Sequence, residues 1–299
     1  MSTLQQLNTV FLENEDLKIS VIPELGGKIS SMIWKPSHFQ FAAQPKGKYE
    51  KPKFGDDFSL FDASGIDDCF PCLHAGIDSI SGYKYPDHGE IWSASMDCRH
   101  ESSSVSLAYE SPHFPYRYEK NISICNNSVF LNYHIENIGK NPFPCIWAFH
   151  GLMRYEEGMK INYPADTTSF LNVLDSALLG KAGTMHSIDG NYDFRRPPKA
   201  SPPSMVKYYL ANPVPQGQCS FYYPSHKLGC RLFYDSKLLP YLGVWITAGE
   251  FRGDYNCALE PCNGFYDDIE TSRKNNAVYF LKPETPLVFT LEMEIFNSQ

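Results

Sequence analysis

The chain has 299 residues, 42% of them hydrophobic and 14% aromatic, which is enough to bury a large core in one big all-β domain. Its 26 basic residues against 34 acidic ones give a net charge of −8 without a clustered basic run, which excludes the electrostatic footprint of a nucleic-acid-binding or anionic-membrane-binding protein. The sequence opens without an export signal and contains no run of about 18 apolar residues, so we expect a cytoplasmic protein that does not enter a membrane. Nine cysteines scattered through apparent strands fit reduced core thiols rather than a disulfide framework.

Strand patterns recur along the whole chain. Strict alternation of apolar and polar residues marks half-buried strands, and aromatic and β-branched runs bounded by Gly, Pro, Asn and Asp mark others. In chain order the predicted strands are 17–21, 28–34, 90–97, 105–109, 116–124, 129–135, 145–155, 220–223, 228–234, 241–246, 257–259, 277–281 and 289–295.

Helical periodicity is weak. The best window is 167–179, and 266–274 has room for one or two turns. Two turn-rich segments, 43–57 and 195–205, are expected to be irregular and exposed or to lie over a cleft. With no βαβ repeat and no linker, the sequence predicts an all-β fold, a large antiparallel β-sandwich formed by residues 1–299 as a single domain.

One carboxylate stands out at the end of a predicted strand. Glu260 lies between Leu259 and Pro261, close in sequence to Trp245 and with few cations beside it. Partial desolvation would raise the pKa of Glu260 and make it a better base at neutral pH. The alternative is a solvated glutamate that caps a turn, which is common at the ends of strands.

Two histidines are candidates for acid–base chemistry. His150 follows Trp147-Ala-Phe149 on a predicted strand and precedes a glycine, whereas His88 lies beside Asp87 in a turn with proline and glycine. Histidine titrates near neutral pH and is a common proton donor or acceptor. The alternatives are a hydrogen-bonded core histidine for His150 and local turn chemistry for His88.

Five motifs along the chain, taken together, resemble the aldose 1-epimerase (galactose mutarotase-like) family. They span nearly the whole chain in the family's order, and they are Leu17-Lys-Ile-Ser-Val-Ile-Pro-Glu-Leu-Gly-Gly-Lys-Ile-Ser-Ser-Met32, Asp87-His-Gly-Glu-Ile-Trp92, Glu136-Asn-Ile-Gly-Lys-Asn-Pro-Phe-Pro144 leading to Phe149-His150, Leu259-Glu-Pro-Cys-Asn-Gly264, and Leu281-Lys-Pro-Glu-Thr-Pro-Leu287.

The resemblance implies a β-supersandwich that binds a free sugar on a concave face. Glu260 is then expected to be the general base on the anomeric hydroxyl, and His150 the general acid on the ring oxygen. His88 would hydrogen-bond the sugar, and Trp92 or Trp245 would supply an apolar platform. The resemblance implies a cofactor-independent enzyme with no metal in its site, a small-molecule sugar as partner, and a monomer or homodimer.

One motif departs from the family. Where relatives commonly carry an arginine, this chain has Asp67 and Asp68, which we expect to face the sugar. An acidic pair argues against a phosphorylated or carboxylated sugar, because the anion would be left unpaired. The family's later substrate-binding aspartate has no assigned counterpart, although Asp235 is a candidate.

Two other functions remain open from the sequence. A protein of this fold could bind a carbohydrate without catalysis, since fold does not fix function. A glycoside hydrolase or lyase would pair Glu260 with Glu90 or an aspartate at a characteristic carboxyl separation.

Overall fold

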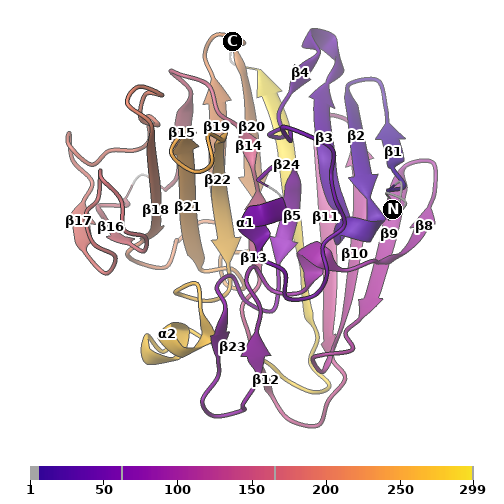
Figure 1. Cartoon of the computed structure of the whole chain (residues 1–299). Helices are drawn as coiled ribbons and strands as arrows, with labels where there is room; N and C mark the ends of the chain where they lie inside the picture. Colours follow the sequence, from indigo (N-terminus) through magenta and orange to yellow (C-terminus); the bar gives the residue numbers. More distant parts are fainter. Residues whose placement is uncertain (1–6, 62, 165, 298–299) are drawn as a thin grey trace, which may run out of the picture.

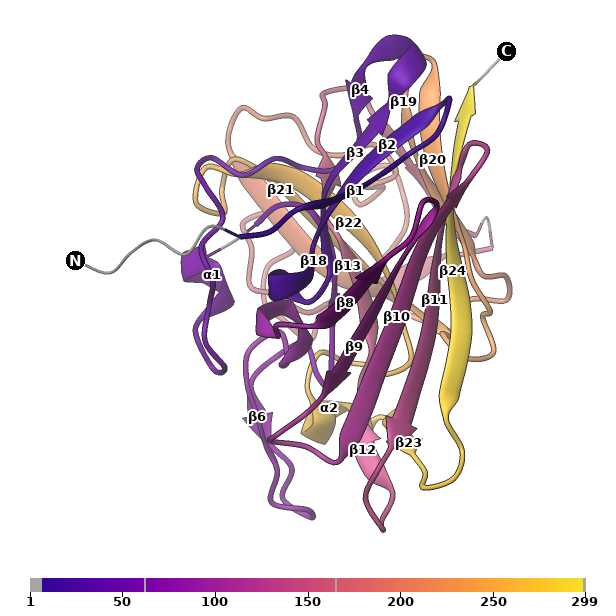
Figure 2. The same cartoon turned by 90° about the vertical axis from the view of Figure 1, so that its right-hand side faces the viewer.

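Two large antiparallel sheets form the computed structural model, which describes residues 7–61, 63–164 and 166–297. They pack face to face as a sandwich (Figures 1 and 2). In spatial order the twelve-stranded sheet contains β1 (Val10–Glu13), β2 (Leu17–Ile22), β3 (Lys28–Trp34), β5 (Ile66–Cys69), β13 (Ala148–Gly151), β22 (Tyr255–Cys262), β21 (Tyr241–Ala248), β18 (Ser204–Leu210), β16 (Ser169–Asn172) and β17 (Met185–Ser187), with β4 (Phe39–Gln40) on β3 and β14 (Met153–Arg154) on β22.

The second sheet has eight strands. In order they are β15 (Lys160–Asn162), β19 (Gln218–Tyr223), β20 (Leu228–Phe233), β24 (Leu287–Asn297), β11 (Ser128–Asn137), β10 (Tyr116–Cys125), β9 (Ser104–Glu110) and β8 (Asp97–His100). Two small ribbons pair β12 (Phe143–Cys145) with β23 (Tyr279–Leu281) and β6 (Gly76–Ile77) with β7 (Lys84–Tyr85). The helical segments are α1 (Phe58–Phe61), α2 (Ile269–Lys274) and the 3₁₀ turns η1 (Pro23–Leu25), η2 (Lys35–Ser37) and η3 (Ile91–Ser93).

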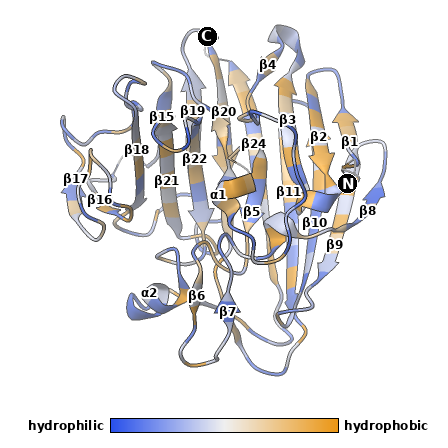
Figure 3. Cartoon of the chain, viewed as in Figure 1, coloured by the Kyte–Doolittle hydropathy of each residue, from blue (hydrophilic) through white to orange (hydrophobic). Residues whose placement is uncertain are grey.

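The core lies between the two sheets. Alternate residues of a strand face the same side, and hydrophobic residues are interspersed with hydrophilic ones along β2 and β3 (Figure 3). Ile122, Leu131 and Leu291 on neighbouring strands of the eight-stranded sheet are fully buried. The alternation in the sequence therefore marks which face of each strand packs inward.

Segments distant in sequence cover the outer face of the twelve-stranded sheet. The helix α1 lies in front of the middle of this sheet in Figure 1, and in Figure 2 it lies on the side away from the eight-stranded sheet. The sandwich thus has one face that is partly covered by α1 and the chain that leads into it, residues 43–61. Neither α1 nor α2, the helices of the described residues, is long and apolar enough to cross a membrane.

The predicted mostly-β class and the antiparallel sandwich are confirmed. The best helical window of the sequence, 167–179, does not form a helix, because 169–172 forms β16 and pairs with β18. Asn172, which is fully buried, donates from Nδ2 to the carbonyls of Leu179, Gly180 and Lys181 and so holds the following turn. The strand expected at 90–97 is also wrong, because 91–93 forms the 3₁₀ turn η3. The short helix within 266–274 and the irregular 43–57 segment are confirmed.

Candidate active site

A cavity of about 470 Å³ opens on the outer face of the twelve-stranded sheet, over β13, β22, β21 and β18. Cavities of this size hold small organic ligands. Its lining residues are Phe58, Ser59, Ala63, His74, Asp87, His88, His150, Leu152, Val173, Leu174, Met205, Lys207, Trp245, Phe251, Glu260, Tyr266, Asp267 and Asp268.

The strand register brings His150 and Glu260 together. Ala148 pairs with Cys262, and Met153 pairs with Cys257, so counting along the two strands places His150 directly opposite Glu260. Side chains that are opposite each other on one face of an antiparallel pair have Cβ atoms about 4.5–5.5 Å apart. Two motifs 110 positions apart in the chain therefore meet on one floor of the cavity.

Glu260 is buried at 1% exposure although its side chain lines the cavity. No hydrogen-bond donor among the described residues reaches its Oε2 atom. Burial raises the pKa of Glu260, against the opposing effects of Lys207 and His150. The Glu260 carboxylate is therefore desolvated and has one oxygen, Oε2, that can accept a hydrogen bond or a proton from a ligand.

The space beside Glu260 depends on a glycine. Gly243 lies opposite Glu260 in the β21–β22 register. A Cβ atom at Gly243 would lie 3.0 Å from Glu260 Oε2 and 3.4 Å from the ring of Tyr209. A larger residue at this position would displace the carboxylate, so the glycine keeps room for it.

His150 is oriented by a buried ion pair on the adjacent strands. Its Nδ1 atom lies 2.8 Å from Asp67 Oδ1, and Lys28 Nζ lies 2.5 Å from Asp67 Oδ2. Asp67 and Lys28 are both 1% exposed. Burial alone would raise the pKa of Asp67, but Lys28 and the hydrogen bond from His150 hold it well below its usual range. The ionised Asp67 accepts a hydrogen bond from the Nδ1–H group of His150. The other ring nitrogen, Nε2, is then available to a ligand in the cavity.

A second ion pair lies across the floor of the cavity from His150. Lys207 Nζ lies 2.9 Å from Asp267 Oδ2, and the hydroxyl of Tyr209 donates to Asp267 Oδ1 at 2.7 Å. Burial would lower the pKa of Lys207, but Asp267 and Glu260 raise it above its usual value. Lys207 therefore remains charged and lowers the cost of ionising Glu260.

His88 contributes to the wall of the cavity nearest α1. Its ring stacks on Phe58 at 3.9 Å between centroids and lies edge-on to His150 at 5.3 Å. The Nδ1 atom lies 3.0 Å from Asp87 Oδ2, without the angle of a hydrogen bond. Burial lowers the pKa of His88, against the opposing effect of Asp87. A neutral imidazole at this wall can donate or accept one hydrogen bond.

Solved structures share this architecture although the sequence matches no protein-family model and no curated protein. The Slr1438 protein from Synechocystis sp. PCC 6803 superposes with a TM-score of 0.75 at 18% identity, covering 100% of this chain and 99% of that one. A galactose mutarotase-like protein from Clostridium acetobutylicum superposes with a TM-score of 0.71 at 14% identity, covering 100% and 98%. A galactose mutarotase related enzyme from Lactobacillus acidophilus gives a TM-score of 0.68 at 14% identity, covering 98% of each chain. The chain has the galactose mutarotase-like fold.

Within this mutarotase-like sandwich, the residues expected from sequence take different positions. His150, Glu260, His88 and Trp245 line the cavity together. Trp92 does not line it: its ring is buried, packs edge-on to Phe58 and donates from Nε1 to the Asp87 carbonyl.

Asp67 and Asp68 point to opposite faces of β5, because successive side chains of a strand alternate. Asp67 reaches the cavity through His150. Asp68 faces the core, where it pairs with Lys120 at 2.7 Å and accepts hydrogen bonds from Tyr118 and Tyr133. The expectation that both aspartates face the sugar is therefore corrected, since neither is among the residues that line the cavity.

Two other acidic candidates lie elsewhere. Both carboxylate oxygens of Glu90 are occupied, by donors from Tyr109, His113, Ser111 and Tyr116. Glu90 therefore connects the loop that contains His88 to the eight-stranded sheet through hydrogen bonds. It is not the second catalytic carboxylate that a glycoside hydrolase would pair with Glu260. Asp235 caps a surface turn and is outside the cavity lining.

The sequence reasoning missed Lys207, Asp267 and Phe58 as cavity residues. The signal for Lys207 was its place in 204–210, where the half-buried Met205 and Lys207 alternate with the buried Val206 and Tyr208. No such signal exists for Asp267 or Phe58, which lie outside regular strands. In the described ranges, no cluster of three or more His, Cys, Asp or Glu side chains is placed to hold a metal ion.

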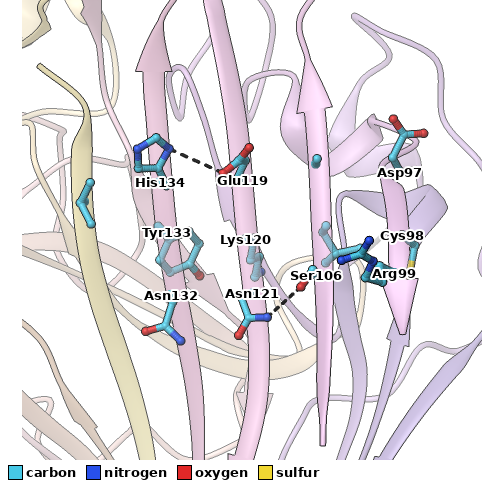
Figure 4. Close-up of a pocket in the computed structure, with 13 residues that line it drawn as sticks. Asp97, Cys98, Arg99, Ser106, Glu119, Lys120, Asn121, Asn132, Tyr133 and His134 are labelled. Carbon is cyan, nitrogen blue, oxygen red and sulfur yellow. Dashed lines mark hydrogen bonds and ion pairs between the residues drawn. The ribbon is translucent and has the colours of Figure 1, made fainter. Parts of the chain in front are cut away.

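A second cavity, of about 590 Å³, lies on the outer surface of the eight-stranded sheet across β8 to β11 (Figure 4). Its polar side chains interact along the surface: Glu119 lies 3.7 Å from His134, and Asn121 donates to Ser106 at 3.0 Å. Glu119 is exposed to water, whereas Glu260 is buried. We therefore place the candidate active site in the cavity of Glu260.

Proposed function

We propose that the protein is an aldose 1-epimerase that interconverts the α and β anomers of a non-phosphorylated aldose. The observation that carries the proposal is the opposition of Glu260 and His150 on adjacent strands. One is a desolvated carboxylate with an unpartnered oxygen, and the other an imidazole held at Nδ1 by Asp67. Ring opening needs a base and an acid of opposite protonation state near neutral pH, and these two groups supply them.

In the proposed reaction, Glu260 takes the proton of the anomeric O1 hydroxyl while Nε2 of His150 gives a proton to the ring oxygen. The bond between C1 and the ring oxygen breaks, and the open aldehyde rotates about its C1–C2 bond. On closure the ring hydroxyl adds to the other face of C1, His150 takes back its proton, and Glu260 returns a proton to O1. Asp67 holds His150 through Nδ1 and keeps Nε2 on the cavity side.

The charge of the cavity favours an unphosphorylated sugar. Asp87, Glu260, Asp267 and Asp268 line it, and Lys207 is already paired with Asp267. An added phosphate or carboxylate would face these carboxylates without a free cation among the residues that line the cavity. The absence of a free cation in this lining agrees with the sequence, which has Asp67 and Asp68 where relatives commonly carry an arginine.

The test is anomeric exchange measured by magnetisation-transfer NMR on a panel of free aldoses, with the wild type, Glu260→Gln and His150→Asn compared side by side. We expect acceleration by the wild type, its loss in Glu260→Gln with sugar affinity kept within about tenfold, and slower exchange in both directions in His150→Asn. Binding of a sugar without acceleration would instead support a carbohydrate-binding protein. Equal rates in wild type and Glu260→Gln would remove Glu260 from the mechanism.

A further inference from the structure

The cavity has a polar half and an apolar half. The polar half contains His88, His150, Glu260 and the Lys207–Asp267 pair. Two residues further along β13 and β21, from His150 to Leu152 and from Gly243 to Trp245, the floor becomes apolar. Lys207 pairs with Trp245 in the register, but its side chain extends to Asp267. Leu152, Met205, Trp245 and Phe251, here termed the apolar shelf, line the cavity at that end. Two residues along a strand correspond to about 6–7 Å.

The position of the shelf follows from the register. Counting from the Met153–Cys257 pair places Leu152 opposite Ala258, and Ala258 pairs with Trp245. Leu152 and Ala258 belong to a small apolar cluster with Ala43, and Trp245 packs against it. Trp245 also contacts Phe251 edge-on at 5.5 Å. The shelf is therefore a packed surface and not a chance exposure of single side chains.

The polar groups of Trp245, Asn256 and Thr247 at the shelf are already hydrogen-bonded, and Lys207, opposite Trp245, is held in an ion pair by Asp267. Trp245 donates from Nε1 to Asn256 Oδ1, and Asn256 donates from Nδ2 to the Ala63 carbonyl. Thr247 Oγ1 donates to the Asp254 carbonyl and accepts from the Phe251 amide. A ligand hydroxyl placed against the shelf would lose its bonds to water without replacement by these groups. Such a loss weakens the binding of a hydroxyl relative to an apolar group at the same place.

We propose that the substrate is an aldose with an apolar substituent at the end away from its anomeric carbon, and that this substituent packs on the apolar shelf. The inference rests on the proposed function, because Glu260 and His150 fix which end of the sugar is the anomeric one. A deoxy carbon or an O-methyl group at position 4 or 6 is the class of substituent. It adds buried apolar area where a hydroxyl would lose hydrogen bonds.

The experiment measures kcat/KM for anomeric exchange with glucose, 4-deoxyglucose, 6-deoxyglucose and 6-O-methylglucose, together with the corresponding Kd values by NMR titration. We expect at least one substituted sugar to be preferred over glucose by about tenfold or more, the range that one apolar group in a pocket contributes. Equal or better use of glucose, in both kcat/KM and Kd, would overturn the inference while leaving the proposed catalysis intact.

A matched pair of variants tests whether the shelf causes the preference. Met205→Gln keeps the length of a half-buried side chain and adds an amide at the shelf, so the preference for the substituted sugar should fall toward unity. Met185→Gln makes the same change at an exposed methionine, 55% accessible, on β17 outside the cavity lining, and should keep it. Preferential binding of a substituted sugar without acceleration would support the shelf and overturn the catalytic proposal. An unchanged preference in Met205→Gln would overturn the assignment of the shelf.

Discussion

Replacement of Asp67 by asparagine removes the carboxylate that joins Lys28 to His150. The pair Lys28–Asp67 is buried, with its charged atoms 2.5 Å apart, so the variant removes the carboxylate that pairs with the ammonium of Lys28 there. Loss of one partner of a buried pair costs about 3–5 kcal/mol of unfolding free energy. For a chain of this length, that corresponds to a melting temperature lower by roughly 5–10 °C.

Asp67→Asn also changes what His150 meets at Nδ1. The carbonyl oxygen of the new amide is drawn to Lys28, which turns its NH₂ group toward Nδ1 and favours the tautomer with the proton on Nε2. Proton transfer in both directions of the proposed reaction then suffers, and we expect kcat to fall by about 10²–10⁴-fold. The assay is anomeric exchange well below the melting temperature, with folding checked by circular dichroism.

The neighbouring residue gives a matched control. Asp68 forms an equally buried pair with Lys120, 2.7 Å apart, on the core face of the same strand and away from the cavity. Asp68→Asn should therefore lose comparable stability and keep kcat. The double variant Lys28→Met/Asp67→Asn should recover part of the lost stability, because it removes both charges of this pair, without recovering kcat. Wild-type kcat in folded Asp67→Asn, or an equal loss of kcat in folded Asp68→Asn, would refute the role of Asp67.

Three further predictions concern Glu260. The raised pKa of Glu260 places the acid limb of the pH profile of kcat/KM above the ordinary glutamate value of about 4.3. Activity is lost as the pH falls through that limb, because the base becomes protonated. A limb at or below about 4.3 would contradict the assignment of Glu260 as base. Lys207→Met removes a cation that lowers the pKa of Glu260, so the limb should move to higher pH, and an unmoved limb would show that the two groups are not coupled. Gly243→Ala should displace the Glu260 carboxylate and lower kcat by about 10²-fold. The control Gly190→Ala, whose added Cβ meets no atom within 4 Å, should keep kcat. Retained activity in Gly243→Ala would show that the site tolerates a displaced carboxylate.

The strands were predictable because their pattern is local. Along 105–109 and 129–135 every second residue is apolar, and the structure buries most of this set against the other sheet, namely Val105, Leu107, Val129, Leu131, Tyr133 and Ile135. The segment 167–179 has an apolar spacing that also fits a helix, but pairing with β18 gives its first residues a sheet edge that a sequence pattern cannot reveal. Tertiary pairing overrides weak helical periodicity there.

The site was predictable in its two principal residues and not in their surroundings. Glu260 and His150 stand in recognisable motifs, but their opposition depends on the register of β13 and β22. The sequence also does not show which of Asp67 and Asp68 lies on the cavity side of β5. Their buried partners, Lys28 and Lys120, lie 39 and 52 positions away in the chain, so no local pattern reveals them.

The place of β24 has a consequence for how the chain acquires its structure. This strand lies between β11 and β20, so it joins two parts of the eight-stranded sheet that are formed by residues 128–137 and 228–233. During synthesis neither β11 nor β20 can complete its hydrogen bonds on that side until residues 287–297 have emerged. The pairings of β24 with β11 and β20 are thus distant in sequence. Distant pairings place folding in the millisecond-to-second range typical of all-β proteins, and two strand edges stay open for a chaperone to protect until then.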